Sequence, residues 1–448
     1  MPDSRDTIAA IATAPGKSGI GIIRISGPKC LDIAQAITTT TLKPRSVQHT
    51  DFLDHNREII DKGIVIYFKA PGSYTGEDVV EFQGHGSMVT LNLLLKEICR
   101  RGARHASPGE FSQRAFLNGK LDLVQAEAVA DLIASTSEKS ARQAIRSLEG
   151  RFSARILDLV EAVTTVRVYV ESALDFSEEE IDVLADAEIP EKIKTILDQL
   201  DRLLNDAVAG KKLREGLNVV IVGRPNVGKS SLLNLLSGSN KAIVTGLAGT
   251  TRDIIEDTIY LDGLAMTLID TAGIRDPENE IEAEGIKRSQ EQIMGADVLV
   301  LVTDNQETTR EETDIVQDHP AEQVFIVHNK IDLYGHPATS KKILEYQHIF
   351  LSASNNEGVD YLIDALQKLV GENNSSEDLV LARERHIHLL TNTRDMLTSG
   401  LEDFHHQGQV ELLAECLKSA QKSLGEITGE VHNDDLLGEI FSRFCIGK

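Results

Sequence analysis

The segment at residues 223–230 restricts the fold of this chain more than any other. It fits the pattern G-x-x-x-x-G-K-S. It follows an apolar run typical of a β-strand, Leu217 to Val222, and precedes a helical run that begins at Ser231. Glycines in this pattern let backbone N–H groups wrap a phosphate at the start of a helix, where the helix dipole also favours an anion. The segment therefore predicts a phosphate-binding loop inside an α/β unit.

The rest of the chain divides by its pattern of apolar and turn-forming residues. Strand-like runs alternate with helical ones across the middle of the chain, which predicts a parallel, doubly wound sheet with strands at 217–222, 265–269, 298–302, 324–327 and 349–351. Helical periodicity dominates before this unit and resumes after a polar stretch at 371–378. We therefore predict a multidomain chain, with an α+β domain at 1–119, a discontinuous all-α domain at 120–214 plus 373–448, and an α/β domain at 215–372 inserted into the all-α domain.

Charge, cysteine content and apolar run length exclude several classes of protein. The chain carries 46 Lys+Arg against 70 Asp+Glu, a net charge of −24, which opposes broad binding to phosphate backbones. Its 4 cysteines form no C-x-x-C pair, so the sequence supports neither a zinc knuckle nor a disulfide framework. No apolar run approaches the roughly 18 residues that a bilayer requires. We expect a soluble cytoplasmic protein without a membrane or DNA partner, whose nucleic-acid contacts are local or shared with another protein.

Short polar segments follow three further predicted strands. Asp332, in Asn329-Lys330-Ile331-Asp332, can accept hydrogen bonds from guanine N1–H and the 2-amino group, and adenine offers neither donor. A buried carboxylate left unpaired costs about 1 to 3 kcal/mol or more, so this segment predicts discrimination against ATP. Ser352-Ala353 can place a backbone N–H against guanine O6, and Asp270 of Asp270-Thr-Ala-Gly273 can hold Mg²⁺ through water. In this order, each at a strand end, the segments predict a GTPase.

The sequence pattern does not identify the residue that positions the attacking water. Ile274 follows Gly273, so the glutamine of Ras-like enzymes is absent. No arginine finger in the same chain is evident, although Arg252 and Arg275 are available, and such a finger contributes about 10³ to 10⁵ in rate. A bound cation could replace it. Spacing alone cannot choose the water-positioning group among the nearby acids, which are Asp276, Glu278, Glu280, Glu282 and Glu284.

Four segments in combination resemble a known family. They are residues 223–231, Thr245-Gly-Leu-Ala-Gly-Thr-Thr-Arg-Asp253, Asp270-Thr-Ala-Gly273 and the C-terminal Phe444-Cys-Ile-Gly-Lys448. The combination closely resembles the MnmE (TrmE) family of tRNA wobble-uridine modification GTPases. The likeness covers essentially the whole chain, including the segments 83–86, 108–111 and 116–123.

The resemblance implies a nucleotide site with two kinds of metal ion. Mg²⁺ would be held by Ser230 and Thr251, and the water-orienting glutamate of the family maps onto Glu282. A K⁺ ion would be held, in place of an arginine finger, by Asn226, Thr245, Leu247 and Thr250. The implied catalytic residues are Glu282, Lys229, which bridges the β- and γ-phosphates, and Cys445. The implied GTP site comprises Asn226, Val227, Gly228, Lys229, Ser230, Ser231, Thr245, Gly246, Leu247, Ala248, Gly249, Thr250, Thr251, Asp270, Thr271, Ala272, Gly273, Asn329, Lys330, Asp332, Ser352 and Ala353.

The resemblance also implies a one-carbon site near the chain ends. The N-terminal domain would bind a 5-formyl or methylene tetrahydrofolate, with contacts at Arg24, Glu81, Lys120 and Lys448. Cys445 would lie near the one-carbon unit, and the alternative for this thiol is a small buried apolar residue. Family members are homodimers through this domain, and their GTPase domains approach each other when GTP and K⁺ are bound.

The implied reaction adds an aminomethyl or carboxymethylaminomethyl group to C5 of the wobble uridine of certain tRNAs. It requires an FAD-dependent MnmG-type partner in a heterotetramer or larger complex, because this chain has no flavin motif. Arginines recur every four or five residues, at 142, 146, 151 and 155, which predicts one exposed helical stripe that is either a solvated face or a tRNA contact. A ribosome-assembly GTPase of the Era or Der type lacks support because no basic G-x-x-G loop is present. A membrane-remodelling GTPase lacks support because the chain is acidic.

Overall fold

The structure is a computed structural model. It describes residues 6–447 except 136–137, 176–187, 216, 239–255, 262–263, 271–292, 306, 310–311, 313, 315, 318, 321–322, 372–378, 432–433 and 443. The chain forms two compact units. One comprises Met1–Ala130, Arg146–Leu197 and Leu389–Lys448, and the other comprises Asp131–Ile145 and Asp198–His388. Within the described part of the chain, no helix is both long and apolar enough to span a lipid bilayer.

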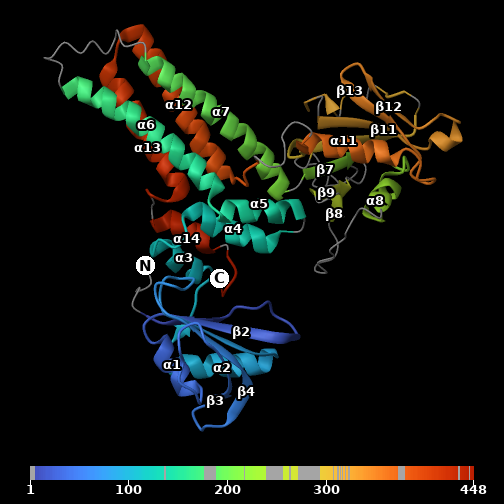
Figure 1. Ribbon diagram of the computed structural model, residues 1–448. Helices are drawn as coiled ribbons and strands as arrows, with labels where there is room; N and C mark the ends of the chain where they lie inside the picture. The colour runs from blue at the N-terminus through green and yellow to red at the C-terminus, as the bar shows by residue number, and fades with distance from the viewer. Residues whose placement is uncertain are drawn as a thin grey trace, which may run out of the picture. The chain divides into compact units, whose positions relative to one another are not determined.

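A six-stranded sheet with two helices on one face forms the N-terminal part, as expected for an α+β domain (Figure 1). The strand order is β3-β4-β5-β2-β1-β6. The helices α1 and α2 pack on the sheet because their apolar side chains share one core with Phe52 and Phe82. The element bounds are β1 Ile8–Ile11, β2 Ser18–Ser26, α1 Cys30–Ile37, β3 Val47–Leu53, β4 Ile59–Phe68, β5 Val79–Gly86, α2 Met88–Arg100 and β6 Arg104–His105.

Helices follow, as the periodicity predicts. Their bounds are α3 Glu110–Leu117, α4 Leu123–Ala134, α5 Glu138–Leu148, α6 Arg151–Asp175, α7 Glu188–Glu215, α12 Glu384–Gln407, α13 Val410–Thr428 and α14 Asp434–Ser442. In α13, which packs along α6, one apolar row is fully buried, comprising Leu413, Leu417, Ala420, Leu424 and Ile427.

The four arginines at 142, 146, 151 and 155 do not share one helix. Gly150, with φ of +85°, separates α5 from α6 and so divides them into two pairs. Arg142 also pairs with Glu138 at 2.6 Å, and Arg151 pairs with Glu149 at 3.5 Å. A continuous basic stripe was therefore a wrong expectation.

The second sheet carries the glycine-rich segment. Its order is β12-β13-β11-β10-β7-β9-β8, and the central strands β13, β11, β10, β7 and β9 run parallel. Apolar residues of α8 and α11 cover one face, where they share a core with Val219, Val300 and Val327 (Figure 1). The bounds are β7 Leu217–Val222, α8 Lys229–Gly238, β8 Glu256–Leu261, β9 Leu264–Asp270, β10 Val298–Thr303, β11 Val324–His328, β12 Thr339–Ile343, β13 Tyr346–Phe350 and α11 Val359–Gly371.

All five strands expected here are present, but the sheet is not purely parallel. Its two edge strands, β8 and β12, pair antiparallel with β9 and β13. The sequence analysis missed both. In β12, Lys341 and Lys342 are exposed, so the strand has no apolar alternation to reveal it. Charged residues at a sheet edge are common because they discourage pairing with another chain.

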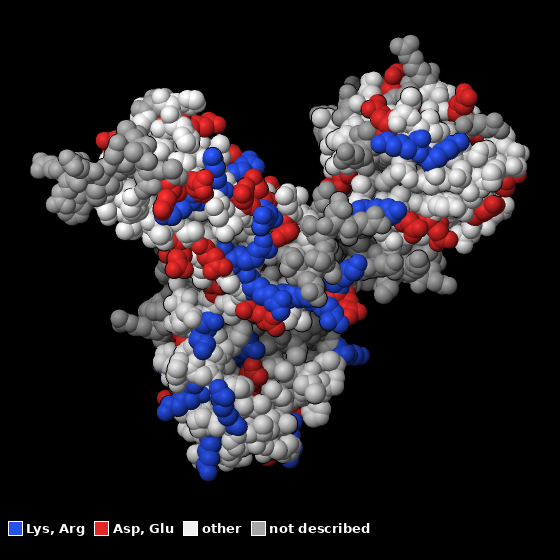
Figure 2. Space-filling view, turned by 45° about the horizontal axis from the view of Figure 1, so that its top comes forward, with Lys and Arg blue, Asp and Glu red and all other residues white. Residues whose placement is uncertain are grey.

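Charges of both signs intermingle on the surface. On the face seen in Figure 2, Lys and Arg form small groups bordered by Asp and Glu.

Candidate functional site

The glycine-rich loop joins the end of β7 to the start of α8. Gly223 has φ of +148°, and a Cβ there would lie 2.2 Å from Val302 O. Gly228 has φ of +100°, and a Cβ there would lie 2.2 Å from Asn329 Nδ2. Position 223 therefore requires glycine for steric as well as backbone reasons, and position 228 requires it for its backbone conformation. The loop delivers its backbone directly into the N-terminus of α8, as a phosphate-binding loop requires.

The lysine of the loop is held in a position from which it can meet a phosphate. Lys229 is 8% exposed, and its Nζ donates hydrogen bonds to Gly223 O at 2.8 Å and to Arg224 O at 3.0 Å. Both carbonyls belong to the loop, so the Lys229 ammonium group lies against the loop backbone. Ser230 follows as the second residue of α8 and is exposed.

Asn329 connects three segments that lie far apart in the sequence. Its Nδ2 donates to Val227 O at 2.8 Å, and its Oδ1 accepts from Ala353 N at 2.9 Å. It therefore fixes the phosphate loop and the Ser352-Ala353 segment relative to each other. The Asn329 amide therefore links these two segments directly.

Lys330 and Asp332 follow from the same strand end. Lys330, with φ of +64°, donates from Nζ to Asn226 O at 2.6 Å and to Asp304 Oδ2 at 2.8 Å. Asp332 Oδ1 accepts from Ser352 Oγ at 2.6 Å. Asp332 is exposed.

Asn226 lies at the tip of the loop with φ of +64° and an exposed side chain. Asparagine tolerates this left-handed conformation better than most residues. Its amide oxygen is a donor atom suited to a hard cation. Asp270 is the last residue of β9, at the same end of the sheet as the loop, because its register partner on β7 is Ile221.

Several predicted residues lie outside the described part of the chain. They are Thr245, Gly246, Leu247, Ala248, Gly249, Thr250, Thr251, Thr271, Ala272, Gly273, Glu282 and Lys448.

Two of the predicted folate contacts face each other on neighbouring strands. Arg24 of β2 pairs in register with Glu81 of β5, and its NH2 lies 2.9 Å from Glu81 Oε1. The Arg24 guanidinium carbon lies 5.1 Å from the Tyr74 ring centroid and 5.7 Å from that of Phe111, which fixes it by cation–π contact. Lys120 donates from Nζ to Pro71 O at 3.2 Å.

Cys445 is exposed, so the alternative that it is a small buried apolar residue is wrong. Its carbonyl oxygen accepts a hydrogen bond from Gly109 N at 3.3 Å, two residues before Phe111. A Cβ on Gly447, which has φ of +96°, would lie 2.4 Å from Ile11 O. The C-terminal segment therefore packs on β1, the neighbour of the strand that carries Arg24, and the structure brings the two ends of the chain together.

A buried ionic network, which sequence analysis missed, supports this region. Glu110 is 1% exposed and accepts hydrogen bonds from Arg104 NH2 at 2.5 Å and Arg114 NH2 at 3.1 Å. Asp6 accepts from the same two arginines at 2.6 Å each. Burial alone would raise the pKa of Glu110, but the hydrogen bonds from Arg104 and Ser107 N and the nearby positive charge hold it below its usual value. The partners lie up to 108 residues apart, so no local pattern signals them.

The class of protein follows from the fold and this geometry. A glycine loop lies between a parallel strand and a helix, and the segment that follows β11 holds Asn329, which bonds to the loop, and the exposed acid Asp332. These features define a P-loop GTPase.

The particular family follows from comparison with known proteins. The family model "MnmE helical domain" matches residues 123–445, and "GTP-binding protein TrmE N-terminus" matches residues 7–120. A curated relative from Marinobacter nauticus, a tRNA modification GTPase MnmE, is 48% identical over 456 residues and covers 100% of both chains. A relative of the same name from Proteus mirabilis is 47% identical over 99% of this chain and 100% of its own length. The chain therefore belongs to the MnmE family.

Solved structures of GTPase domains also align with part of the chain. The G domain of the T. maritima FeoB iron transporter is 22% identical, covers 35% of this chain and 99% of its own length, and has a TM-score of 0.27.

Proposed function

We propose that this chain hydrolyses GTP at the site formed by the phosphate loop and the Asn329–Asp332 segment. One observation supports this most directly. Asn329 joins the loop, through Val227 O, to Ala353 N, so the part that would meet the phosphates and the part that would meet the base are held together. Such preorganisation lowers the cost of ordering the site on binding.

The residues at this site suit Mg²⁺ and K⁺. Hydroxyl oxygens on Ser230 and Thr251 are ligands that Mg²⁺ accepts beside phosphate oxygens. The amide oxygen of Asn226, with Thr245, Leu247 and Thr250, would hold K⁺ and supply positive charge beside the β- and γ-phosphates. Glu282 would orient the attacking water, in place of the glutamine that Ile274 replaces. Approach of two such domains in a homodimer would order the segment 245–253 and stimulate hydrolysis.

The potassium requirement is tested by exchanging the salt. Turnover of GTP should fall at least about tenfold when KCl is replaced by NaCl at equal ionic strength, because the substitute for an arginine finger is lost. Asn226→Ala should remove most of this difference and leave GDP affinity nearly unchanged. The control is Asn234→Ala, an exposed asparagine in the same domain. Equal rates in both salts for the unmodified chain would refute the cation role.

We further propose that the chain modifies tRNA at its one-carbon site. A tetrahydrofolate derivative would bind at Arg24, Glu81, Lys120 and Lys448, and its methylene carbon would reach C5 of the wobble uridine. The partner would be an MnmG-type flavoprotein that carries FAD. The exposed Cys445, anchored through its carbonyl beside Phe111, supports a role for the thiol at this site. The domains at 1–119, 120–214 plus 373–448, and 215–372 would carry the folate, helical and GTPase parts.

Cys445→Ser tests whether the thiol takes part in modification. In cells that depend on this variant, carboxymethylaminomethyl or aminomethyl nucleosides at the wobble position should fall to background, whereas purified variant protein should hydrolyse GTP at the normal rate. Mass spectrometry of tRNA nucleosides provides the first measurement and phosphate release the second. Cys416→Ser, in α13, is the matched control. Normal modification by the Cys445→Ser variant would exclude this role.

A further inference from the structure

The tip of the phosphate loop is held from outside by a chain of three residues. The backbone carbonyl of Asn226, at the tip, accepts a hydrogen bond from Lys330 Nζ at 2.6 Å. The same ammonium group lies 2.8 Å from Oδ2 of Asp304, the residue that follows β10. One lysine therefore joins the loop to a carboxylate that has no part in the nucleotide and metal contacts proposed above.

Both residues joined by the first of these hydrogen bonds have a left-handed backbone. Asn226 and Lys330 each have φ of +64°. Non-glycine residues favour a negative φ, so contacts with the rest of the domain must hold these two in place. The hydrogen bond from Lys330 Nζ to Asn226 O is such a contact. Because it fixes the carbonyl of Asn226, it also limits the directions in which the Asn226 side chain can project.

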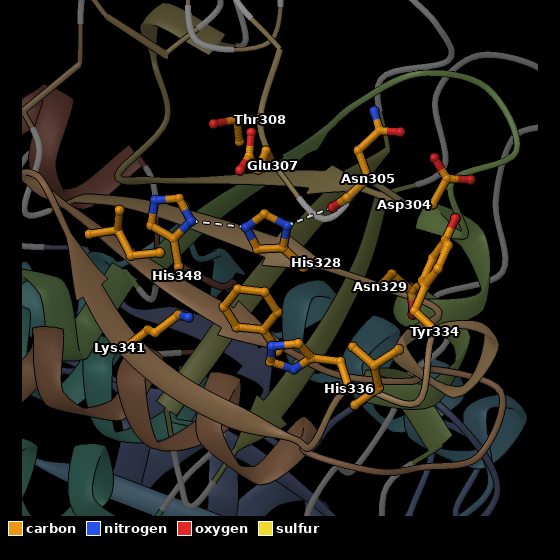
Figure 3. Close-up of a pocket in the computed structure, with 13 residues that line it drawn as sticks. Asp304, Asn305, Glu307, Thr308, His328, Asn329, Tyr334, His336, Lys341 and His348 are labelled. Atoms are coloured by element: carbon orange, nitrogen blue, oxygen red, sulfur yellow. Dashed lines mark hydrogen bonds between the residues drawn. The ribbon is translucent and has the colours of Figure 1, made fainter.

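The backbone on both sides of Asp304 is anchored to the end of β11. Thr303 O accepts a hydrogen bond from Asn329 N at 2.8 Å. Asn305 O lies 2.8 Å from His328 Nδ1, which must donate because a carbonyl oxygen can only accept (Figure 3). Asp304 therefore starts from a fixed backbone position, and its carboxylate can hold the Lys330 ammonium group in one place.

The Lys330 ammonium group brings positive charge to the residue that would bind K⁺. Its hydrogen bond ends on the backbone oxygen of Asn226, whereas the amide oxygen of the same residue is the proposed cation ligand. Two positive charges that share one residue repel each other, and a carboxylate beside one of them offsets this repulsion. The side chains of Lys330 and Asp304 are 31% and 36% exposed, so water weakens the effect without removing it.

We propose that Asp304 is a positioning residue that raises the affinity of the phosphate-loop tip for K⁺. It acts through Lys330, by holding the ammonium group on Asn226 O and by neutralising its charge. The inference rests on the proposed role of K⁺ in hydrolysis, and it assigns part of the affinity for the cation to a residue outside the proposed set of cation ligands.

Binding of a transition-state mimic reports the cation without turnover. The full chain is titrated with fluorescently labelled GDP and aluminium fluoride, which together imitate the phosphoryl group in transfer, in KCl and in NaCl at equal ionic strength. Because coupling between two ligands is reciprocal, the ratio of the two dissociation constants measures how well K⁺ binds relative to Na⁺. In the unmodified chain, binding should be at least about fivefold tighter in KCl.

Two substitutions at Asp304 separate its charge from its hydrogen bond. Asp304→Ala removes both, so the advantage of KCl over NaCl should fall at least about threefold. Asp304→Asn keeps an oxygen that can accept from Lys330 Nζ but removes the charge, so it should give an intermediate ratio. Asp360→Asn, at an exposed acid on α11, is the control and should leave the ratio unchanged. The ion pair is partly exposed, so neither change at Asp304 should unfold the domain.

Turnover provides a second readout. The KCl concentration that gives half-maximal GTP hydrolysis should rise at least about threefold in Asp304→Ala. The maximal rate at saturating KCl should fall by a smaller factor, because a weakened cation site can still be filled. A role in folding alone would instead lower binding and rate by the same factor in both salts.

Two results would overturn the role of Asp304. One is a KCl advantage in Asp304→Ala equal to that of the unmodified chain, and the other is a loss of binding by the same factor in both salts. Failure of the underlying cation role gives a different result, because the unmodified chain would then bind the mimic and hydrolyse GTP equally well in KCl and NaCl. That result would refute both proposals, whereas a KCl advantage that Asp304→Ala retains would refute only this one.

Discussion

Asp332→Asn should convert the chain from a GTP-binding to a xanthosine triphosphate-binding protein. The carboxylate can accept from both guanine N1–H and the 2-amino group, as we propose, whereas an amide has one acceptor and one donor group. The guanine amino group would then meet an amide N–H, and each lost or unpaired contact costs about 1 to 3 kcal/mol, or roughly 5- to 150-fold in affinity. Xanthine carries an oxygen at position 2, which can accept a hydrogen bond from the amide of the variant. The affinity that the variant loses for guanine nucleotides is therefore regained for xanthine nucleotides.

The measurement is a competition of GDP and xanthosine diphosphate for the purified variant. Ser352 Oγ, which donates to Asp332 Oδ1 at 2.6 Å, can also donate to the amide oxygen, so the variant should fold normally. Asp364→Asn, an exposed acid on α11, is the control. Unchanged GDP affinity in Asp332→Asn would show that another group selects the base.

Lys229→Ala should abolish GTP hydrolysis, with a loss of at least about a hundredfold in turnover at saturating GTP, and should weaken GTP binding. The loss combines two effects. The ammonium charge is no longer available to the phosphates, and Gly223 O and Arg224 O lose the donor that now holds the loop in shape.

Lys342→Ala on the edge strand provides a control for removal of one positive charge. Single-turnover hydrolysis and nucleotide titration separate the chemical step from binding. GTP turnover by Lys229→Ala within a few-fold of the unmodified chain would show that the loop lysine does not act on the phosphates. Circular dichroism of the variant would show whether the loss of these two hydrogen bonds unfolds part of the domain.

The central strands of the GTPase domain were predictable because a strand that is buried on both faces consists of consecutive apolar residues. β7 was predicted with its bounds as observed, and the turn to α8 follows from its glycines. Edge strands β8 and β12 were not predictable from the same signal. An edge strand is stabilised by one neighbour and tolerates exposed lysines, so its sequence resembles that of a loop.

Individual side-chain states also depended on the tertiary structure. The sequence could not show that Asp332 and Cys445 lie at the surface. The pairing of Arg24 with Glu81 depends on strand register, which the sequence leaves open. The arginine row at 142–155 seemed continuous in sequence, but Gly150 divides it between two helices.

The sequence by itself determined the phosphate loop, the order of the guanine-recognition segments and the division into α+β, helical and α/β parts, because each depends on local spacing or periodicity. Only the tertiary structure decided which distant groups meet. Asn329 reaches Val227 across 102 residues, Arg114 reaches Asp6 across 108, and His328 and His348 join from neighbouring strands. Such contacts arise when chain segments pack in three dimensions, and no period or motif along the chain encodes which partner a polar side chain will find.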